Sequence, residues 1–449
     1  MKKKIIALAA ALCLALGAVG CGSGDTSSSS SQAETTAAET TTTAATEAPA
    51  EETTTTTTAA ETTTTAAAEE KPEETSEEAA DESEAKEAVE LEYWTEDSPV
   101  KQSIIDWVTE VTDPSSDKFI PVEDRIVVSD MDGTLIGELY PAYFDYCMFV
   151  HRALYDEDYK DKASDEMKDF AHELEEAFKT RTLPKGSDVI HAKYAAEAYK
   201  GMTIDELREY TKEFMKTEAE GFNNLTRGEA YYKPMASLLK YLEANDFTIY
   251  VVSGTDRTLA RELCAEMFGI PANRVIGTDT TLVAEHQEDH DGLDYLYQPD
   301  DEVVFGGEFI TKNLKMNKVA VIAREIGIVP VLALGNSSGD LSMGQYTTLN
   351  SKYDARAYML LCDDTEREYG KLDVAKTFKE SCEELGFTTV SMKNDFATIY
   401  GDDVTITAEK TEEKSEEKEE EKTEDSAEEK TDDKAAEEET EDQAEKKAA

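Results

Sequence analysis

Three short apolar runs rich in β-branched residues constrain the fold of this chain most. They occupy residues 125–129, 247–252 and 328–334, and helical patterns follow the second run at 258–268 and the third from Leu341 onward. Continuous apolar runs of this size are typical of strands buried on both faces of a parallel sheet. Their alternation with helices predicts an α/β fold built on a doubly wound parallel sheet.

Only part of the chain has the composition of a folded core. Of 449 residues, 39% are hydrophobic, and the formal net charge is −54. Residues 22–90 are rich in Thr, Ala, Glu and Ser, and residues 408–449 are dominated by Glu and Lys. Such segments bury too little apolar surface to offset their conformational entropy. We predict a disordered stalk at 22–90 and a disordered acidic tail at 408–449, with a single charged helix as the alternative for the tail.

The first residues have the features of a processing signal. Lysines at positions 2–4 precede an apolar stretch at 5–16, and Ala18-Val19-Gly20-Cys21 follows. This pattern resembles a bacterial lipoprotein signal, although Ala18 stands where that family usually has Leu. We therefore predict a signal peptide at 1–21 and a lipid on Cys21 that anchors the protein to the cell membrane, outside the cytoplasm. An ordinary secretory signal and an uncleaved anchor are the alternatives, and both also place the chain outside.

The charge of the chain excludes one class of partner. There are 99 acidic residues against 45 basic ones, whereas a nucleic-acid-binding protein needs a basic face that displaces counterions from phosphates. An anionic membrane surface would repel the chain equally. We therefore expect no nucleic-acid partner, and membrane contact through the N-terminal lipid only.

Each apolar run ends in a polar, glycine-containing loop. Asp130 and Asp132 follow the first run, residues 253–255 the second and residues 335–340 the third. In an open parallel sheet, the carboxyl ends of neighbouring strands open into one crevice where ligands bind. Two close carboxylates at the end of an apolar strand are costly without a cation, so the pattern indicates a hard metal ion such as Mg²⁺.

These loops carry a resemblance to a known family. Asp130-Met131-Asp132-Gly133-Thr134 resembles the DxDGT motif of phosphatases in the haloacid dehalogenase superfamily. Ser253 matches the second motif, Lys315 heads a helix like that of the third, and the 335–340 loop resembles the acidic fourth motif. All four occur in the family's order. The insertion at 137–233 is similar to the helical cap of the phosphoserine phosphatase-like branch, which leaves 91–136 and 234–407 as the catalytic core.

The resemblance implies a role for each residue of the first motif. Asp130 is the expected nucleophile, which attacks phosphorus and forms an aspartyl-phosphate. Asp132 is the expected general acid and base, which protonates the departing alkoxide and then activates water. Thr134 is expected to hold Asp132 in place. Because a carbon–halogen bond needs no proton on its leaving group, the presence of Asp132 favours phosphomonoesters over haloalkanoates.

The second and third motifs imply the phosphate-binding groups. Ser253 and the backbone amide of Gly254 are expected to hold phosphate oxygens near a helix start. Lys315 is expected to supply the fixed positive charge that steadies phosphate and nucleophile. Lys318, in the same helix, is a rival for that role.

The fourth motif departs from the common pattern of the family. Asn336 stands where many relatives have a directly ligating Asp, and Asp340 follows four residues later. The expected Mg²⁺ ligands are the Asp130 carboxylate, the Asp132 backbone carbonyl, and either Asn336 directly or Asp340, through water if needed. We favour Asp340 as the essential acid.

The resemblance thus implies a Mg²⁺-dependent enzyme that hydrolyses small phosphomonoesters. The alternative is a catalytically silent surface lipoprotein whose phosphatase-like domain binds a ligand or partner. Aromatic residues near the start of the cap, including Tyr143 and Phe144, fall at helical spacing and are expected in the cap core. In an aromatic and mildly acidic cap they would also suit a cationic leaving group such as choline.

Overall fold

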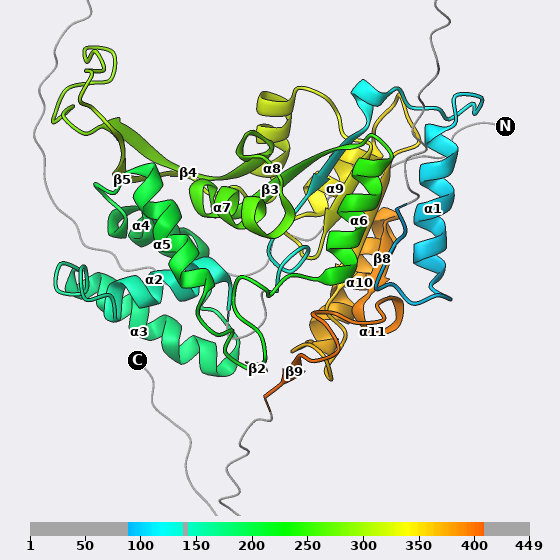
Figure 1. The fold of residues 1–449 in the computed structure, drawn as a ribbon, viewed down its shortest axis with the longest axis horizontal. Helices are drawn as coiled ribbons and strands as arrows, with labels where there is room; N and C mark the ends of the chain where they lie inside the picture. The colour runs from blue at the N-terminus through cyan, green and yellow to red at the C-terminus, as the bar shows by residue number, and fades with distance from the viewer. Residues whose placement is uncertain (1–88, 138–141, 408–449) are drawn as a thin grey trace, which may run out of the picture. The chain divides into compact units, whose positions relative to one another are not determined.

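The computed structural model describes residues 89–137 and 142–407 (Figure 1). The predicted signal peptide, the lipidated Cys21, almost all of the predicted stalk and the predicted tail lie outside these residues. No helix in the described ranges is long and apolar enough to cross a membrane.

A seven-stranded sheet forms the centre of the fold, with the strand order β5-β4-β3-β1-β6-β7-β8. The central strand β1 pairs in parallel with β3 on one side and β6 on the other. Among the seven strands of this sheet in the described ranges, only the edge strand β5 runs antiparallel to its neighbour β4. The strands are β1 Ile126–Ser129, β3 Thr248–Asp256, β4 Val275–Ala284, β5 Val303–Thr311, β6 Leu332–Gly335, β7 Arg356–Leu361 and β8 Thr388–Ser391. The predicted α/β class is confirmed.

Helices cover both faces of this sheet, as a doubly wound fold requires (Figure 1). Successive residues of β1 point to opposite faces, so Val127 belongs to one hydrophobic core and Val128 to the other. The first core includes residues of α1 Pro99–Thr112, α6 Lys233–Ala244 and α7 Arg257–Phe268. The second includes residues of α8 Met316–Val321, the π-helical turn Ile322–Ile326, α9 Leu341–Thr348 and α10 Leu372–Leu385. The short helix α11 Met392–Asp395 follows β8.

Within the described residues, the insertion after β1 contains four helices. They are α2 Phe144–Leu154, α3 Asp165–Thr180, α4 Ser187–Ala198 and α5 Ile204–Met215. Thr203 and Glu206 form a capping box that fixes the start of α5. The insertion is not entirely helical, because the two-residue strand β2 Phe222–Asn223 pairs antiparallel with β9 Thr405–Ile406.

The strands do not follow the apolar runs of the sequence residue for residue. The third apolar run, predicted to begin at Ile328, becomes regular strand only at Leu332, since Pro330 has no backbone N–H to donate to a neighbouring strand. β4 extends through polar residues to Ala284, because its second half pairs with β5 instead of lying in the apolar core.

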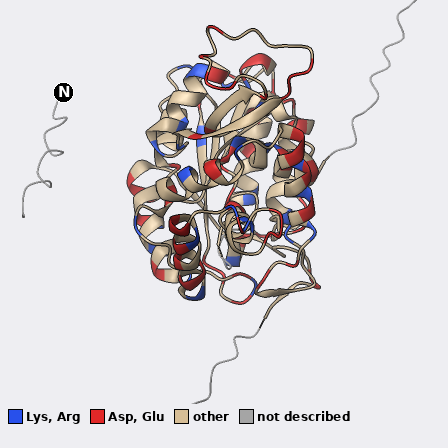
Figure 2. Ribbon diagram, turned by 90° about the vertical axis from the view of Figure 1, so that its left-hand side faces the viewer, with Lys and Arg blue, Asp and Glu red and all other residues tan. Residues whose placement is uncertain are grey.

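Figure 2 shows Lys and Arg scattered among Asp and Glu along the helices.

A buried acid beyond β7 gives the fold a testable pH dependence. Glu368 is buried, and its carboxylate accepts hydrogen bonds from the Tyr400 hydroxyl and the Tyr369 amide. Burial raises the pKa of Glu368 from 4.5 to about 7. When the pKa of a carboxyl is higher in the folded than in the unfolded state, the unfolding free energy falls as pH rises from the unfolded-state pKa to the folded-state pKa. For Glu368 this loss is about 3 kcal/mol at most between pH 4.5 and 7.

Replacing Glu368 with glutamine should therefore flatten the fall in unfolding free energy over this pH range. Urea denaturation of both proteins at pH 5 and pH 8 measures the effect. Exposed Glu366 offers a matched control, because Glu366→Gln should leave the pH profile of the wild type unchanged. A Glu368→Gln profile with the wild-type slope would show that Glu368 is not the titrating group.

Candidate active site

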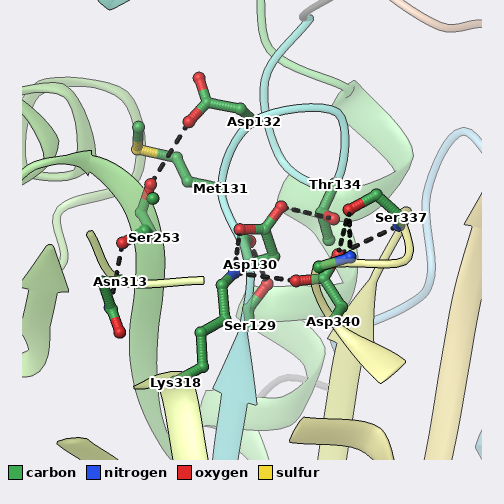
Figure 3. Close-up of polar contacts among 12 residues, drawn as sticks. Ser129, Asp130, Met131, Asp132, Thr134, Ser253, Asn313, Lys318, Ser337 and Asp340 are labelled. Carbon is green, nitrogen blue, oxygen red and sulfur yellow. Dashed lines mark hydrogen bonds and ion pairs between the residues drawn. The ribbon is translucent and has the colours of Figure 1, made fainter. Parts of the chain in front are cut away.

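A buried lysine between two carboxylates lies at the carboxyl end of β1. Asp130 follows β1 directly, and its Oδ1 lies 2.5 Å from Lys318 Nζ, on α8. The same Nζ donates to Asp340 Oδ1 at 2.8 Å, at the start of α9 (Figure 3). Lys318 has no exposed surface, and both carboxylates are buried. The loops after the first and third apolar runs supply the two carboxylates, and α8 supplies the lysine.

The structure corrects the choice between the two lysines of this helix. Lys315 is exposed, immediately before the first residue of α8, and its backbone amide donates to the Gly339 carbonyl. Lys318 lies within α8 on its buried side. The positive charge beside Asp130 therefore comes from Lys318, and Lys315 was the wrong prediction for that place.

Asp340 holds the fourth loop and the lysine together. Its Oδ2 accepts from the backbone amides of Asn336 and Ser337 and from the Ser337 hydroxyl, each at 3.1 Å. Gly335 permits this approach, since a Cβ there would lie 2.5 Å from the Asp340 Cβ. Asp340 Oδ1 accepts from Lys318, and Oδ2 accepts from the fourth loop. Asp340 is therefore placed to orient the lysine.

Thr134 has different neighbours from those expected. Its hydroxyl lies 3.3 Å from Asp130 Oδ2 and 3.2 Å from Asn336 Oδ1. The prediction that Thr134 holds Asp132 was therefore wrong. Thr134 instead brings the nucleophile candidate and the Asn336 amide oxygen to one point.

Asp132 is held by residues of β3. The Thr255 hydroxyl donates to Asp132 Oδ2 at 2.8 Å, and the Ser253 hydroxyl donates to the same oxygen at 3.3 Å. Asp132 Oδ1 is buried without a hydrogen-bond partner in the described part of the chain. Sequence analysis missed Thr255, although it closes the same tripeptide as Ser253.

The residues predicted to bind phosphate are fixed by neighbouring backbone contacts. Ser253 and Gly254 lie within β3, where the pairing with β4 is irregular between Val252 and Asp256, and not beyond the strand end. Asn313 donates to the Ser253 carbonyl at 3.0 Å, and the Thr278 hydroxyl donates to the Gly254 carbonyl at 2.6 Å. This part of β3 is therefore held rigidly beside Asp132.

Burial raises the pKa of both aspartates of the first motif. Burial, with the nearby Asp340 charge, raises the pKa of Asp130 to about 7 against the opposing effect of Lys318. Burial, with the nearby Asp145 charge, raises the pKa of Asp132 to about 6. A bound cation beside Lys318 would add positive charge and favour the ionised form of Asp130 that a nucleophile needs, whereas the raised pKa of Asp132 lets it carry a proton at mildly acidic pH.

These groups line a cavity of about 100 Å³ between the core and the insertion. The insertion contributes Tyr143, Asp145, Tyr146 and Asp188 to the lining of this cavity. Lys312, the residue that follows β5, also lines it. Sequence analysis singled out neither Lys312 nor the two acids. The cavity thus combines a candidate nucleophile, a candidate proton donor and two lysines.

The oxygen atoms beside Asp130 fit a hard divalent cation as ligands. No group of three or more His, Cys, Asp or Glu residues in the described ranges is arranged to bind a metal. The Asp130 carboxylate and the Asn336 amide oxygen nevertheless share the Thr134 hydroxyl as a neighbour. Mg²⁺ needs oxygen ligands and is usually held by one or two carboxylates while keeping several waters. Asn336, whose oxygen is on the Asp130 side, fits better as a direct ligand than Asp340.

The fold and the site together define an α/β domain with a buried aspartate directly after the central strand. Residues 127–345 match the profile of the family described as "haloacid dehalogenase-like hydrolase". This part of the chain is therefore similar to a haloacid dehalogenase-like hydrolase domain, the family that the motifs resemble.

Several solved structures are similar to the chain at low identity. A conserved functionally unknown protein from Anaerococcus prevotii is 12% identical, with a TM-score of 0.40, over 65% of this chain and 91% of that one. Cytosolic 5'-nucleotidase IIIB bound to cytidine is 11% identical, with a TM-score of 0.37, over 65% and 84%. A probable phosphoserine phosphatase from Vibrio cholerae is 12% identical, with a TM-score of 0.30, over 59% of each chain. Comparison with curated proteins found no match.

Proposed function

We propose that the chain is a Mg²⁺-dependent phosphatase that hydrolyses small phosphomonoesters through an aspartyl-phosphate on Asp130. The observation that best supports this proposal is the buried contact between Lys318 and Asp130. A second buried carboxyl, Asp132, follows Asp130 two residues later. A carboxylate can attack a phosphate only where positive charge offsets their repulsion. Bound Mg²⁺ would supply the rest of that charge and polarise the phosphoryl oxygens.

The first step transfers the phosphoryl group to the protein. An Asp130 oxygen forms a bond to phosphorus while the bond from phosphorus to the ester oxygen breaks. Asp132 gives its proton to the departing alkoxide, so a neutral alcohol leaves. Thr255 and Ser253 aim Asp132 for this transfer through their hydrogen bonds to its Oδ2.

The second step returns Asp130 to its starting state. Asp132, now ionised, accepts a proton from a water that attacks phosphorus, and the bond between Asp130 and phosphorus breaks to release inorganic phosphate. The Gly254 amide and Lys312 are the groups proposed to hold phosphate oxygens in both steps, whereas the Ser253 hydroxyl, predicted for that role, already donates to Asp132. Lys318 stays beside Asp130 and offsets its charge whenever the carboxylate is free.

We further propose that Cys21 carries a lipid and that the domain acts at the outer side of the cell membrane. The basic start, the apolar stretch and the small residues before Cys21 support this placement. The predicted stalk would then separate the domain from the membrane surface.

Hydrolysis of p-nitrophenyl phosphate with and without a chelator tests the proposed activity. Treatment with EDTA should lower turnover by about 100-fold or more, because Asp130 then lacks the charge that the cation supplies. Excess Mg²⁺ should restore it, whereas excess Ca²⁺, which prefers more ligands and longer distances, should not. A protein that is inert with Mg²⁺ from pH 5 to pH 8 would favour the silent lipoprotein instead.

A further inference from the structure

A second, smaller cavity adjoins the catalytic one on the side of the insertion. It has a volume of about 20 Å³, and its lining includes Asp145, His191 and Tyr199 from the insertion and Lys312 from the core. Asp145 and Lys312 line both cavities. The smaller cavity does not include Asp130, so it extends the site away from the nucleophile candidate. It lies next to Asp145, whose charge acts on Asp132.

Buried polar atoms in this region lack hydrogen-bond partners. Asp145 Oδ1, His191 Nδ1 and the Tyr199 hydroxyl have none within the described residues, and these side chains belong to residues only 2–4% exposed. The nearest charge pairing for His191 is Asp145 Oδ2 at 3.9 Å, which is beyond hydrogen-bond distance. Leaving such atoms without partners is costly, so their placement indicates a ligand.

The missing partner must be a hydrogen-bond donor. His191 Nε2 faces the Asp145 backbone carbonyl at 3.3 Å and donates to it, so Nδ1 of the neutral ring presents a lone pair. Stacking on Tyr146, with ring centroids 3.9 Å apart, holds the ring in this orientation. Together with Asp145 Oδ1, the region offers two acceptors without partners in the described residues.

The charge of the region favours a cation. Lys318 already pairs with the two carboxylates on the nucleophile side. Asp145 and Asp188 line the rest of the cavity with Lys312, which forms no ion pair with any residue of the described ranges and is proposed to hold phosphate. A cationic group on the leaving alcohol would offset this excess of negative charge.

We propose that the alcohol released by this enzyme is a small amino alcohol without a carboxylate, whose ammonium N–H groups bind Asp145 Oδ1 and His191 Nδ1. The proposal rests on the proposed phosphatase function and specifies its substrate class. A primary ammonium has three donors for these acceptors, whereas a quaternary ammonium such as choline has none and would leave them without partners. The sequence-based choline hypothesis is thereby replaced by one with N–H donors.

Kinetics with four phosphate esters test this choice. The values of kcat/KM should be highest for ethanolamine phosphate, and at least about 10-fold lower for the other three esters. The choline ester has no N–H on its ammonium group, the serine ester adds a carboxylate, and the glycerol ester has no positive charge. Asp145→Asn should lower kcat/KM for ethanolamine phosphate about 100-fold, and that for glycerol phosphate about 10-fold at most, because for glycerol phosphate only the effect of the Asp145 charge on Asp132 is lost. Asp169→Asn, the same substitution at an exposed site of α3, is the matched control and should change neither. A preference for the serine, choline or glycerol ester, or an equal loss on all esters in Asp145→Asn, would overturn the proposal.

Binding separates this proposal from the phosphatase function itself. Calorimetric titration of the Asp130→Asn variant, which cannot form the phosphoenzyme, should show tighter binding of ethanolamine phosphate than of choline phosphate. Adding Asp145→Asn should remove the difference. If the wild type hydrolyses no ester but this binding preference holds, the phosphatase proposal fails and the ammonium site stands. If all esters bind equally, the ammonium site fails whatever the turnover.

Discussion

Lys318→Met is expected to abolish hydrolysis and to destabilise the fold, whereas Lys315→Met should do neither. Lys318 is completely buried, and its ammonium contacts Asp130 and Asp340 at 2.5 and 2.8 Å. Without it, two buried carboxylates would face each other, at a cost of about 3–5 kcal/mol in unfolding free energy. Turnover of p-nitrophenyl phosphate should fall by about 10³-fold or more, because the fixed charge beside the nucleophile is lost.

Urea denaturation and steady-state kinetics of both variants measure the two effects. Lys315 is the matched control, since it is exposed and three residues away in the same segment. The double variant Lys318→Met/Asp340→Asn should recover part of the lost stability, because one buried charge is removed, but none of the activity. Normal activity in Lys318→Met together with inactivity in Lys315→Met would restore the original sequence-based assignment.

The sheet and the position of its loops could be predicted because they depend on local pattern. The apolar runs that became β1, β3 and β6 are continuous, and polar residues follow each of them. Parallel pairing then brings their carboxyl ends together whatever the surrounding loops do. Asp130, Asp132 and Asp340 follow from this reasoning without any knowledge of side-chain geometry.

The choice between Lys315 and Lys318 could not be made in the same way. Both occur in one helical pattern, and which of them is buried depends on the residue at which the helix begins. The structure begins α8 at Met316, which leaves Lys315 in the exposed turn before it. Helix boundaries depend on capping contacts with distant segments, here the amide of Lys315 with the Gly339 carbonyl.

Lys312 and Asp145 were missed for a different reason. Lys312 reaches the site because β5 pairs with β4, and the long polar loop between these strands hides that pairing in the sequence. Asp145 lies in the first turn of α2, where an acidic residue also stabilises the helix dipole. Only the position of the insertion against the core shows that its side chain faces the cavity.

Asp130→Asn and Asp132→Asn should both inactivate the enzyme, but at different steps. Asn at 130 cannot form the acyl-phosphate, so turnover of every ester should fall by about 10⁴-fold or more and no phosphoprotein should form. Asn at 132 removes the proton transfers, so turnover should fall about 10²–10⁴-fold. Because p-nitrophenolate leaves without a proton, Asp132→Asn should still be phosphorylated by p-nitrophenyl phosphate and accumulate as the phosphoenzyme, which intact-protein mass spectrometry after acid quench would detect.

Stability separates this loss of activity from loss of structure. Burial and Asp340 raise the pKa of Asp130 to about 7, so its ionised form costs the fold stability above that pH, and this cost vanishes as pH falls toward the unfolded-state value of 3.8. Asp130→Asn should therefore unfold at the same or a higher urea concentration than the wild type at pH 8, although it is inactive. A variant that is both inactive and less stable at pH 8 would mean that Asp130 is chiefly a structural partner of Lys318, and the nucleophile would have to be sought elsewhere in the cavity.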